Sequence, residues 1–188
     1  MDTRVVDIRR KQGYALEHDE IETITRIYQA NNSFYTPTLR ERMSVETDTD
    51  VELYGKLLER TEERIAQGYI FYLIYLDGKL IGFNNHRLTE QYIKGRTMSV
   101  LEIGTTCIDP EYHNRGIGSA LYSRIDDDAN NLYKVEAVTR GTWSTNLRQC
   151  HLYEKHGYKK FLIKIDYYGL EGVDSISYYK ELNSNKGE

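Results

Sequence analysis

The strongest constraint on the fold of this chain is a succession of three predicted strands with no helix between them. Residues 69–76 form the longest apolar run, and their length suits a buried strand. Asp77 and Gly78 follow as a hairpin signal that leads into a second strand at 80–88, and a third strand is predicted at 98–108. Strands in such direct succession pair antiparallel, which excludes a TIM barrel and a regular doubly wound sheet.

Helical spacing and turn residues predict the elements on either side of these strands. Ser144 is a good N-cap for the last helix, which is expected to end at His156 and Gly157. The order β-α-α-β-β-β-α-β-α-β-β indicates a mixed α/β (α+β-like) fold, with a mostly antiparallel central sheet flanked by helices, in one domain over residues 1–188. The further elements are strands at 4–9, 135–139, 158–166 and 175–182, and helices at 17–30, 48–67, 116–130 and 144–156.

Charge and cysteine content exclude several classes of protein. The 25 Lys+Arg and 29 Asp+Glu give a net charge of −4, without the basic excess of a nucleic-acid binder. Cys107 and Cys150 are too few for a disulfide framework, and His151 and His156 do not share a helix face, so no metal site is expected. No signal peptide follows Met1 and no apolar run approaches about 18 residues, so a cytoplasmic protein without a membrane span is predicted.

A glycine-rich turn follows the strand that ends at Ile108 and opens the helix at 116–130. The first turn of a helix has unpaired backbone N–H groups at its positive end, and glycines let a phosphate approach them closely. Arg115 adds a cation beside this turn. Leu121 breaks the dinucleotide fingerprint, and the Gly-Lys-Ser/Thr of a Walker A loop is absent. Taken alone, a Gly-x-Gly turn fits a tight strand–helix corner at least as well.

Together with its flanking residues, this turn resembles the acetyl-CoA motif of the GNAT superfamily of N-acetyltransferases. That motif, (Gln/Arg)-x-x-Gly-x-(Gly/Ala), follows a strand and a Pro-Glu-Tyr, and here Pro-Glu-Tyr at 110–112 precedes HNRGIG at 113–118, with His113 in place of Gln or Arg. A second family motif, Asn-x-x-Ala-x-x-Leu-Tyr-Glu-Lys-x-Gly-Phe, is matched by NLRQCHLYEKHGY at 146–158, with Gln149 in place of Ala. The resemblance covers nearly the whole chain and implies the GNAT fold and an acetyl-CoA-dependent N-acetyltransferase.

The resemblance also implies which residues bind acetyl-CoA and which one donates a proton. The backbone of residues 106–108 would pair with the pantetheine arm like an added strand, and residues 115–119 would hold the pyrophosphate. Tyr153 matches the family's general acid, whose phenol donates to the coenzyme sulfur; the alternative is a core tyrosine, since the chain has 17. The expected cofactor-binding residues are Thr106, Cys107, Ile108, His113, Asn114, Arg115, Gly116, Ile117, Gly118, Ser119, Asn146 and Tyr153.

Glu102 is the candidate base that would deprotonate the attacking amine. An alkyl ammonium, with a pKa of about 10, has to lose a proton before it attacks. Glu102 lies in a mostly apolar strand, where desolvation would raise the pKa of its carboxyl, at a position where some family members carry a catalytic Glu. Two alternatives remain: a solvent-facing Glu in a cross-strand ion pair, and deprotonation through ordered water.

The sequence says less about the acceptor. Residues 1–68 hold 14 acidic and 10 basic side chains, against 15 of each in 69–188, and this excess favours a small cationic amine over a neutral one. Residues 167–174 resemble the Tyr-Tyr…Asp segment of protein N-terminal and lysine acetyltransferases, so a peptide or protein amine is a second possible acceptor. The alternative for these residues is a hairpin turn without a role in substrate binding. A non-catalytic acyl-CoA-binding sensor on the same fold is the alternative function, and the chain could be a monomer or a homodimer.

Overall fold

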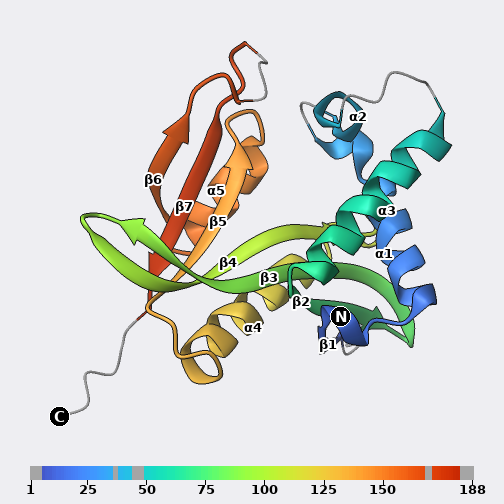
Figure 1. Cartoon of the computed structure of the whole chain (residues 1–188), viewed down its shortest axis with the longest axis horizontal. Helices are drawn as coiled ribbons and strands as arrows, with labels where there is room; N and C mark the ends of the chain where they lie inside the picture. Colours follow the sequence, from blue (N-terminus) through green and yellow to red (C-terminus); the bar gives the residue numbers. More distant parts are fainter. Residues whose placement is uncertain (1–5, 36–37, 44–48, 168–170, 183–188) are drawn as a thin grey trace. The chain divides into compact units, whose positions relative to one another are not determined.

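The computed structural model describes residues 6–35, 38–43, 49–167 and 171–182 (Figure 1). The strands are β1 (Asp7–Gln12), β2 (Ile70–Leu76), β3 (Lys79–Ile93), β4 (Arg96–Ile108), β5 (Ala137–Trp143), β6 (Lys159–Lys164) and β7 (Ser175–Glu181). The helices are α1 (His18–Ala30), α2 (Leu39–Arg42), α3 (Asp50–Ala66), α4 (Ile117–Asn131) and α5 (Leu147–Lys155), with 3-10 turns η1 (Gly13–Ala15), η2 (Asn32–Phe34) and η3 (Pro110–Tyr112).

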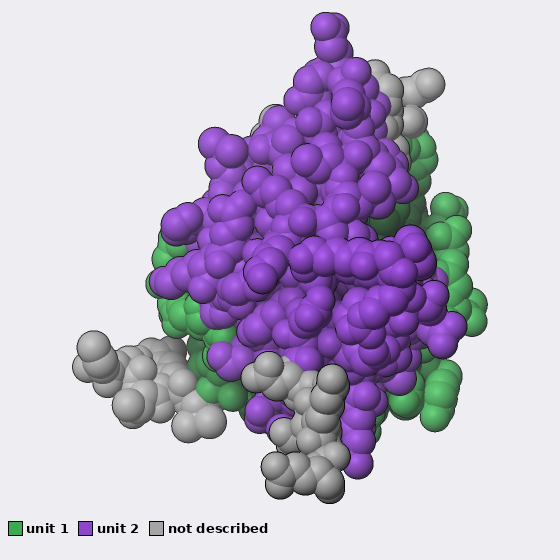
Figure 2. Space-filling model, turned by 90° about the vertical axis from the view of Figure 1, so that its left-hand side faces the viewer, with its two compact units in different colours: residues 1–86, 105–121 green, residues 87–104, 122–188 purple. Residues whose placement is uncertain are grey.

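The strands form one seven-stranded sheet in the order β1-β2-β3-β4-β5-β7-β6. β1–β2, β2–β3, β5–β7 and β6–β7 are antiparallel, whereas β4 and β5 are parallel. This confirms the predicted mixed α/β class with a mostly antiparallel sheet. The chain divides into two compact units, residues 1–86 with 105–121 and residues 87–104 with 122–188, coloured separately in Figure 2.

Two tight hairpins join the three central strands, and the sequence revealed only the first. Asp77 and Gly78 have φ of 51° and 77°, the left-handed pair that a two-residue hairpin needs. Lys94 and Gly95 repeat this geometry, with φ of 48° and 86°, between β3 and β4. Both strands extend beyond their predicted limits at this turn. The sequence did not reveal the extensions, because residues 89–97 are largely polar and carry little apolar periodicity.

In the first unit, α1 and α3 pack on a core of strand residues, as their helical spacing predicts. Ile24 and Ile27 of α1 and Leu53 and Leu57 of α3 are buried in one cluster with strand residues that include Phe71. The helix limits are close to those predicted, although residue 48 lies outside the described residues. The short α2 was missed because a four-residue helix has too few positions to show a period.

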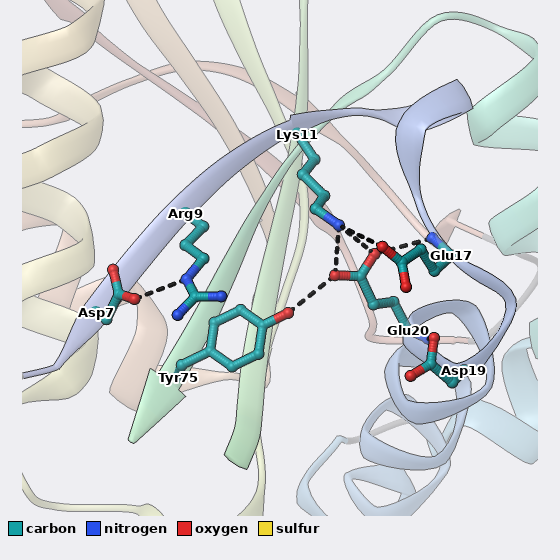
Figure 3. Close-up of polar contacts among 7 residues, drawn as sticks. All are labelled: Asp7, Arg9, Lys11, Glu17, Asp19, Glu20 and Tyr75. Carbon is teal, nitrogen blue, oxygen red and sulfur yellow. Dashed lines mark hydrogen bonds and ion pairs between the residues drawn. The ribbon is translucent and has the colours of Figure 1, made fainter. Parts of the chain in front are cut away.

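A buried acidic residue, Glu20, joins α1 to the two nearest strands (Figure 3). Its carboxylate accepts hydrogen bonds from Lys11 Nζ at 2.7 and 2.8 Å, from the Tyr75 hydroxyl at 2.9 Å and from the Glu17 backbone N–H at 2.9 Å. Burial raises the pKa of Glu20, but these donors outweigh it and hold the pKa below its usual value. Burial, together with Glu20, raises the pKa of Tyr75 to about 12.

The predicted limits of the first strand and of the last helix were wrong as well. The first strand runs from Asp7 to Gln12 rather than 4–9, because it keeps pairing with β2 as far as Gln12; residues 4 and 5 lie outside the described residues. The last helix is capped by Asn146, which accepts from the Gln149 N–H at 3.2 Å. Ser144 instead accepts from the Asp174 N–H at 2.9 Å, since β5 continues to Trp143 beside β7.

Candidate active site

The end of β4, predicted to pair with pantetheine, is held by amide side chains of β3 in the first unit. Asn84 donates from Nδ2 to Thr106 Oγ1 at 2.8 Å, and Asn85 accepts from the Thr105 N–H at 2.9 Å. Arg64 of α3 donates to both Asn85 Oδ1 and Thr105 Oγ1. Sequence reasoning missed this network, although two adjacent asparagines inside the strand predicted at 80–88 are an available signal, and both are buried.

Gly82 of β3 allows the same part of β4 to approach closely. A Cβ at this position would lie 2.9 Å from the Cys107 carbonyl oxygen and 3.3 Å from Ile108 Cα. The Asp109 N–H then donates to the Ile81 carbonyl at 2.8 Å. The backbone of residues 107–108 therefore rests directly on β3 without a side chain between them.

The loop that follows β4 turns sharply into α4. Asn114 and Gly116 have left-handed φ of 62° and 80°, whereas Arg115 between them does not. This alternation turns successive backbone N–H groups to one side, the geometry of anion-binding nests. The space where a Gly116 Cβ would lie is open, and α4 begins at Ile117 with its first-turn N–H groups following this loop. Backbone N–H groups in this arrangement suit an anion, and pyrophosphate binding at this loop stays a prediction.

Two side chains of this loop, His113 and Arg115, contact neighbouring segments. His113 donates from Nε2 to the Ile108 carbonyl at 2.9 Å, and its ring packs edge-on against Phe34 at 4.9 Å between centroids. Arg115 donates to the Glu111 carbonyl at 3.0 Å and is exposed to solvent. Because His113 is held in this way, the anion-binding capacity of the loop lies mainly in its backbone N–H groups.

Other predicted residues of the first unit are distributed between core and surface. Cys107 is buried, and its thiol lies 3.2 Å from the Tyr35 hydroxyl; burial raises the pKa of this thiol to about 12. Ile117 is also buried, while Gly118 is partly exposed and Ser119 exposed. Only the backbone of Cys107 and Ile117 is therefore suited to ligand binding.

In the second unit, the candidate acid Tyr153 lies within a group of tyrosines. Its side chain is 7% exposed, and its hydroxyl donates a long hydrogen bond, 3.4 Å, to the Gly141 carbonyl. The rings of Tyr178, Tyr158 and Tyr122 lie 5.2, 5.9 and 6.2 Å from the Tyr153 ring. Burial raises the pKa of Tyr153 well above its usual value, so its phenol is protonated and, by itself, a weak acid.

A buried arginine beside this group was not predicted. Arg140 of β5 is 2% exposed, and its Cζ lies 4.1 Å from the Tyr122 ring centroid, 4.7 Å from that of Tyr158 and 5.8 Å from that of Tyr153. None of its three guanidinium nitrogens makes a well-formed hydrogen bond to a described residue. The predicted strand ended at Thr139, one residue short of this position.

Glu102 and Asn146 lie in the second unit with contacts of their own. Glu102 is partly exposed on β4 and accepts from Arg87 Nε at 2.8 Å, an ion pair that the alternative interpretation of this residue expected. Arg87 occupies Oε2 of this carboxylate. Asn146 caps α5. Within the described ranges, no group of three or more His, Cys, Asp or Glu could hold a metal ion.

Comparison with known families identifies the family of this chain. The sequence pattern of the acetyltransferase (GNAT) family matches residues 24–158, which include both predicted motifs. The chain belongs to this family. The predicted family and fold are therefore confirmed for this GNAT chain. In the part of the chain that the structure describes, no helix is long and apolar enough to cross a membrane.

The relatives of this GNAT chain are distant. The spermine/spermidine N(1)-acetyltransferase of Bacillus subtilis (strain 168) is 23% identical over 96 residues, or 51% of this chain and 62% of that protein, so the match spans less than two thirds of the relative. The spermidine N-acetyltransferase of Vibrio cholerae, solved with CoA and spermine, has a TM-score of 0.65 at 17% identity and covers 95% of this chain and 96% of its own.

A third relative is also known as a structure. A GNAT family acetyltransferase from Elizabethkingia anophelis, solved with acetyl-CoA bound, has a TM-score of 0.59 at 16% identity, covering 94% of this chain and 98% of its own. At such identities the structural likeness establishes the fold alone, and the chemistry has to be argued from the residues of this chain.

Proposed function

We propose that this protein is an N-acetyltransferase that moves an acetyl group from acetyl-CoA to a primary amine by direct attack in a ternary complex, acting as a single domain. The observation that carries the proposal is the loop at 113–119, where left-handed Asn114 and Gly116 present backbone N–H groups at the start of α4. That geometry fits a pyrophosphate, and the chain belongs to a family of acetyltransferases.

The residues present fit acetyl-CoA as co-substrate. The open space at Gly116 leaves room for the pyrophosphate, and the amide network around Thr105 and Thr106 holds the end of β4 extended for the pantetheine arm. Acetyl-CoA supplies an activated acyl group on a thiol leaving group. The positions assigned to it, residues 106–108, 113–119, Asn146 and Tyr153, are part of the proposal.

Two protons have to move in this reaction. The attacking nitrogen loses one to Glu102 or to an ordered water, and the departing sulfur gains one. Tyr153 is suited to the second transfer, because its phenol carries a proton and its existing hydrogen bond to Gly141 is long enough to be exchanged readily. Glu102 starts from its ion pair with Arg87, so ordered water is an equally good candidate for the base.

The acceptor is proposed to be a small cationic amine of the polyamine type. The acidic excess of residues 1–68 supports this choice, because a negative surface concentrates cationic substrates. Bacterial relatives that bear the names of spermine and spermidine acetyltransferases support it as well. A peptide or protein amine is the alternative acceptor.

The proposal is tested by thiol release from acetyl-CoA with spermidine, spermine, aminoglycosides, amino acids and short peptides. Release is expected with polyamines, and Tyr153→Phe is expected to lower kcat about 100-fold, the usual contribution of a general acid. Tyr92→Phe, at a tyrosine 73% exposed on β3, is the matched control and should behave as wild type. Acetyl-CoA binding without release for any amine would instead support the sensor function.

A further inference from the structure

Arg140 is a charged side chain that lies inside the sheet of the second unit. β5 lies between β4 and β7, and Arg140 is opposite Ile103 on one side and Tyr178 on the other. Its guanidinium is fully inside and its donors are unsatisfied among the described residues. Burial of an ionised side chain without such bonds is unfavourable, and an apolar side chain of similar size would fit this place better.

The acidic residue nearest to Arg140 is already satisfied by others. Asp126 of α4 accepts from the Tyr158 hydroxyl at 2.8 Å and from Lys180 Nζ at 2.7 Å. Its distance to Arg140 is 3.9 Å, too long for a hydrogen bond. Removal of the arginine would therefore leave no unpaired carboxylate behind, and the longer ion pair with Asp126 adds to the two hydrogen bonds that this carboxylate already accepts.

What Arg140 contacts instead is the group of rings that holds Tyr153. Its guanidinium faces Tyr122 and Tyr158 at cation–π distance, and both rings pack against Tyr153. The Tyr153 hydroxyl donates to the carbonyl of Gly141, the residue that follows Arg140 on β5. The cation and the phenol are thus tied to adjacent positions of one strand.

We propose that Arg140 is a positioning residue for acetyl transfer, which holds the ring of Tyr153 through Tyr122 and Tyr158 and places a buried positive charge beside its phenol. This inference rests on the proposed function and adds a residue to it. As the phenol gives up its proton, negative charge grows on Tyr153. The desolvated guanidinium of Arg140, whose Cζ lies 5.8 Å from the Tyr153 ring centroid, stabilises that charge.

The effect of Arg140 on the pKa of Tyr153 agrees with this role. Burial raises the pKa of Tyr153, the nearby Tyr122 raises it further, and Arg140 lowers it. Without the arginine the phenol would be a weaker acid and a poorer donor to the sulfur. Further titratable and charged side chains around the Tyr153 ring and its neighbouring tyrosines include Tyr122 and Asp126 on α4, Cys150, Glu154, Lys155 and His156 at α5, Tyr158, Lys160 on β6, and Tyr178 and Lys180 on β7.

Kinetics of Arg140→Met, Arg140→Lys and Tyr153→Phe, alone and combined, test the proposal. Arg140→Met should lower kcat about tenfold, with little change in the KM for acetyl-CoA and no fall in Tm; Arg140→Lys should restore part of the loss. In a Tyr153→Phe background, Arg140→Met should cause no further loss, because the two residues act as a unit. Arg96→Met, at an exposed arginine of β4, is the control.

The outcomes separate this proposal from the proposed function. Losses that multiply in the double variant, or an unchanged kcat in Arg140→Met, refute the role of Arg140 alone. A lowered Tm with a proportional loss of active enzyme in both Arg140 variants would show a structural role and also refute it. A wild-type protein that releases no thiol with any amine refutes the proposed function itself.

Discussion

Substitution of Gly82 by alanine adds a single methyl group where β3 meets the end of β4. The new Cβ would lie 2.9 Å from the Cys107 carbonyl oxygen, 3.2 Å from Ile74 Cδ1 and 3.3 Å from Ile108 Cα. Two of these atoms belong to backbone, which cannot turn away as a flexible side chain would. The alanine therefore has to push residues 107–108 outward by several tenths of an ångström.

The expected size of the effect follows from this geometry. Overpacking of a close-packed interior costs about 1–3 kcal/mol, and for a chain of this length each kcal/mol lowers Tm by about 2–4 °C. Because residues 106–108 are proposed to pair with pantetheine, the same displacement should weaken acetyl-CoA binding. A loss of about 1.4 kcal/mol in this pairing would raise the KM for acetyl-CoA about tenfold.

Thermal unfolding and thiol-release kinetics measure both effects on Gly82→Ala. The matched control is Gly55→Ala on α3, where a Cβ meets no atom within 4 Å and a helix-interior alanine should stabilise by about 0.5–1 kcal/mol. A Gly82→Ala protein with wild-type Tm would refute the steric argument. A lowered Tm with an unchanged KM for acetyl-CoA would refute the place of residues 106–108 in the cofactor site.

Three further predictions concern a buried carboxylate, the two buried thiols and a helix cap. Glu20→Gln should lower the free energy of unfolding by about 1–3 kcal/mol near neutral pH. Since the pKa of Glu20 is lowered on folding, the difference in this free energy between wild type and variant should shrink below about pH 4. Urea titrations at several pH values measure both. Cys107 and Cys150 are buried, so Ellman's reagent should label neither in the native protein and both after denaturation; rapid native labelling contradicts this. Asn146→Ala should destabilise the protein by about 1 kcal/mol through loss of the α5 cap, and an unchanged Tm would contradict that role.

Local signals in the chain were sufficient for much of the fold. Ile24, Ile27, Leu53 and Leu57 lie in the core as their spacing predicts, because a helix brings residues three and four apart onto one face. Gly68 and Gly157 have left-handed φ of 75° and 82° just beyond the helices they were predicted to end. Such signals depend only on neighbours in sequence, so they can be read without knowledge of the fold.

Tertiary contacts altered the remaining boundaries. β5 reaches Trp143 because β7 supplies pairing partners as far as Ser175, and this moves the helix cap from Ser144 to Asn146. Both residues are good caps, so local preference could not separate them. The choice depended on a strand more than thirty residues away in sequence.

The sequence by itself determined the mixed α/β class, the family, and the glycine loop with its backbone N–H groups, since these depend on short spacings and on the conformational freedom of Gly116. Only the tertiary structure decided the state of each charged and polar side chain. It pairs Glu102 with Arg87, turns His113 back to the Ile108 carbonyl, and buries Arg140 among tyrosines. Burial and partners are properties of surroundings assembled from distant segments, and they determine which side chain can move a proton.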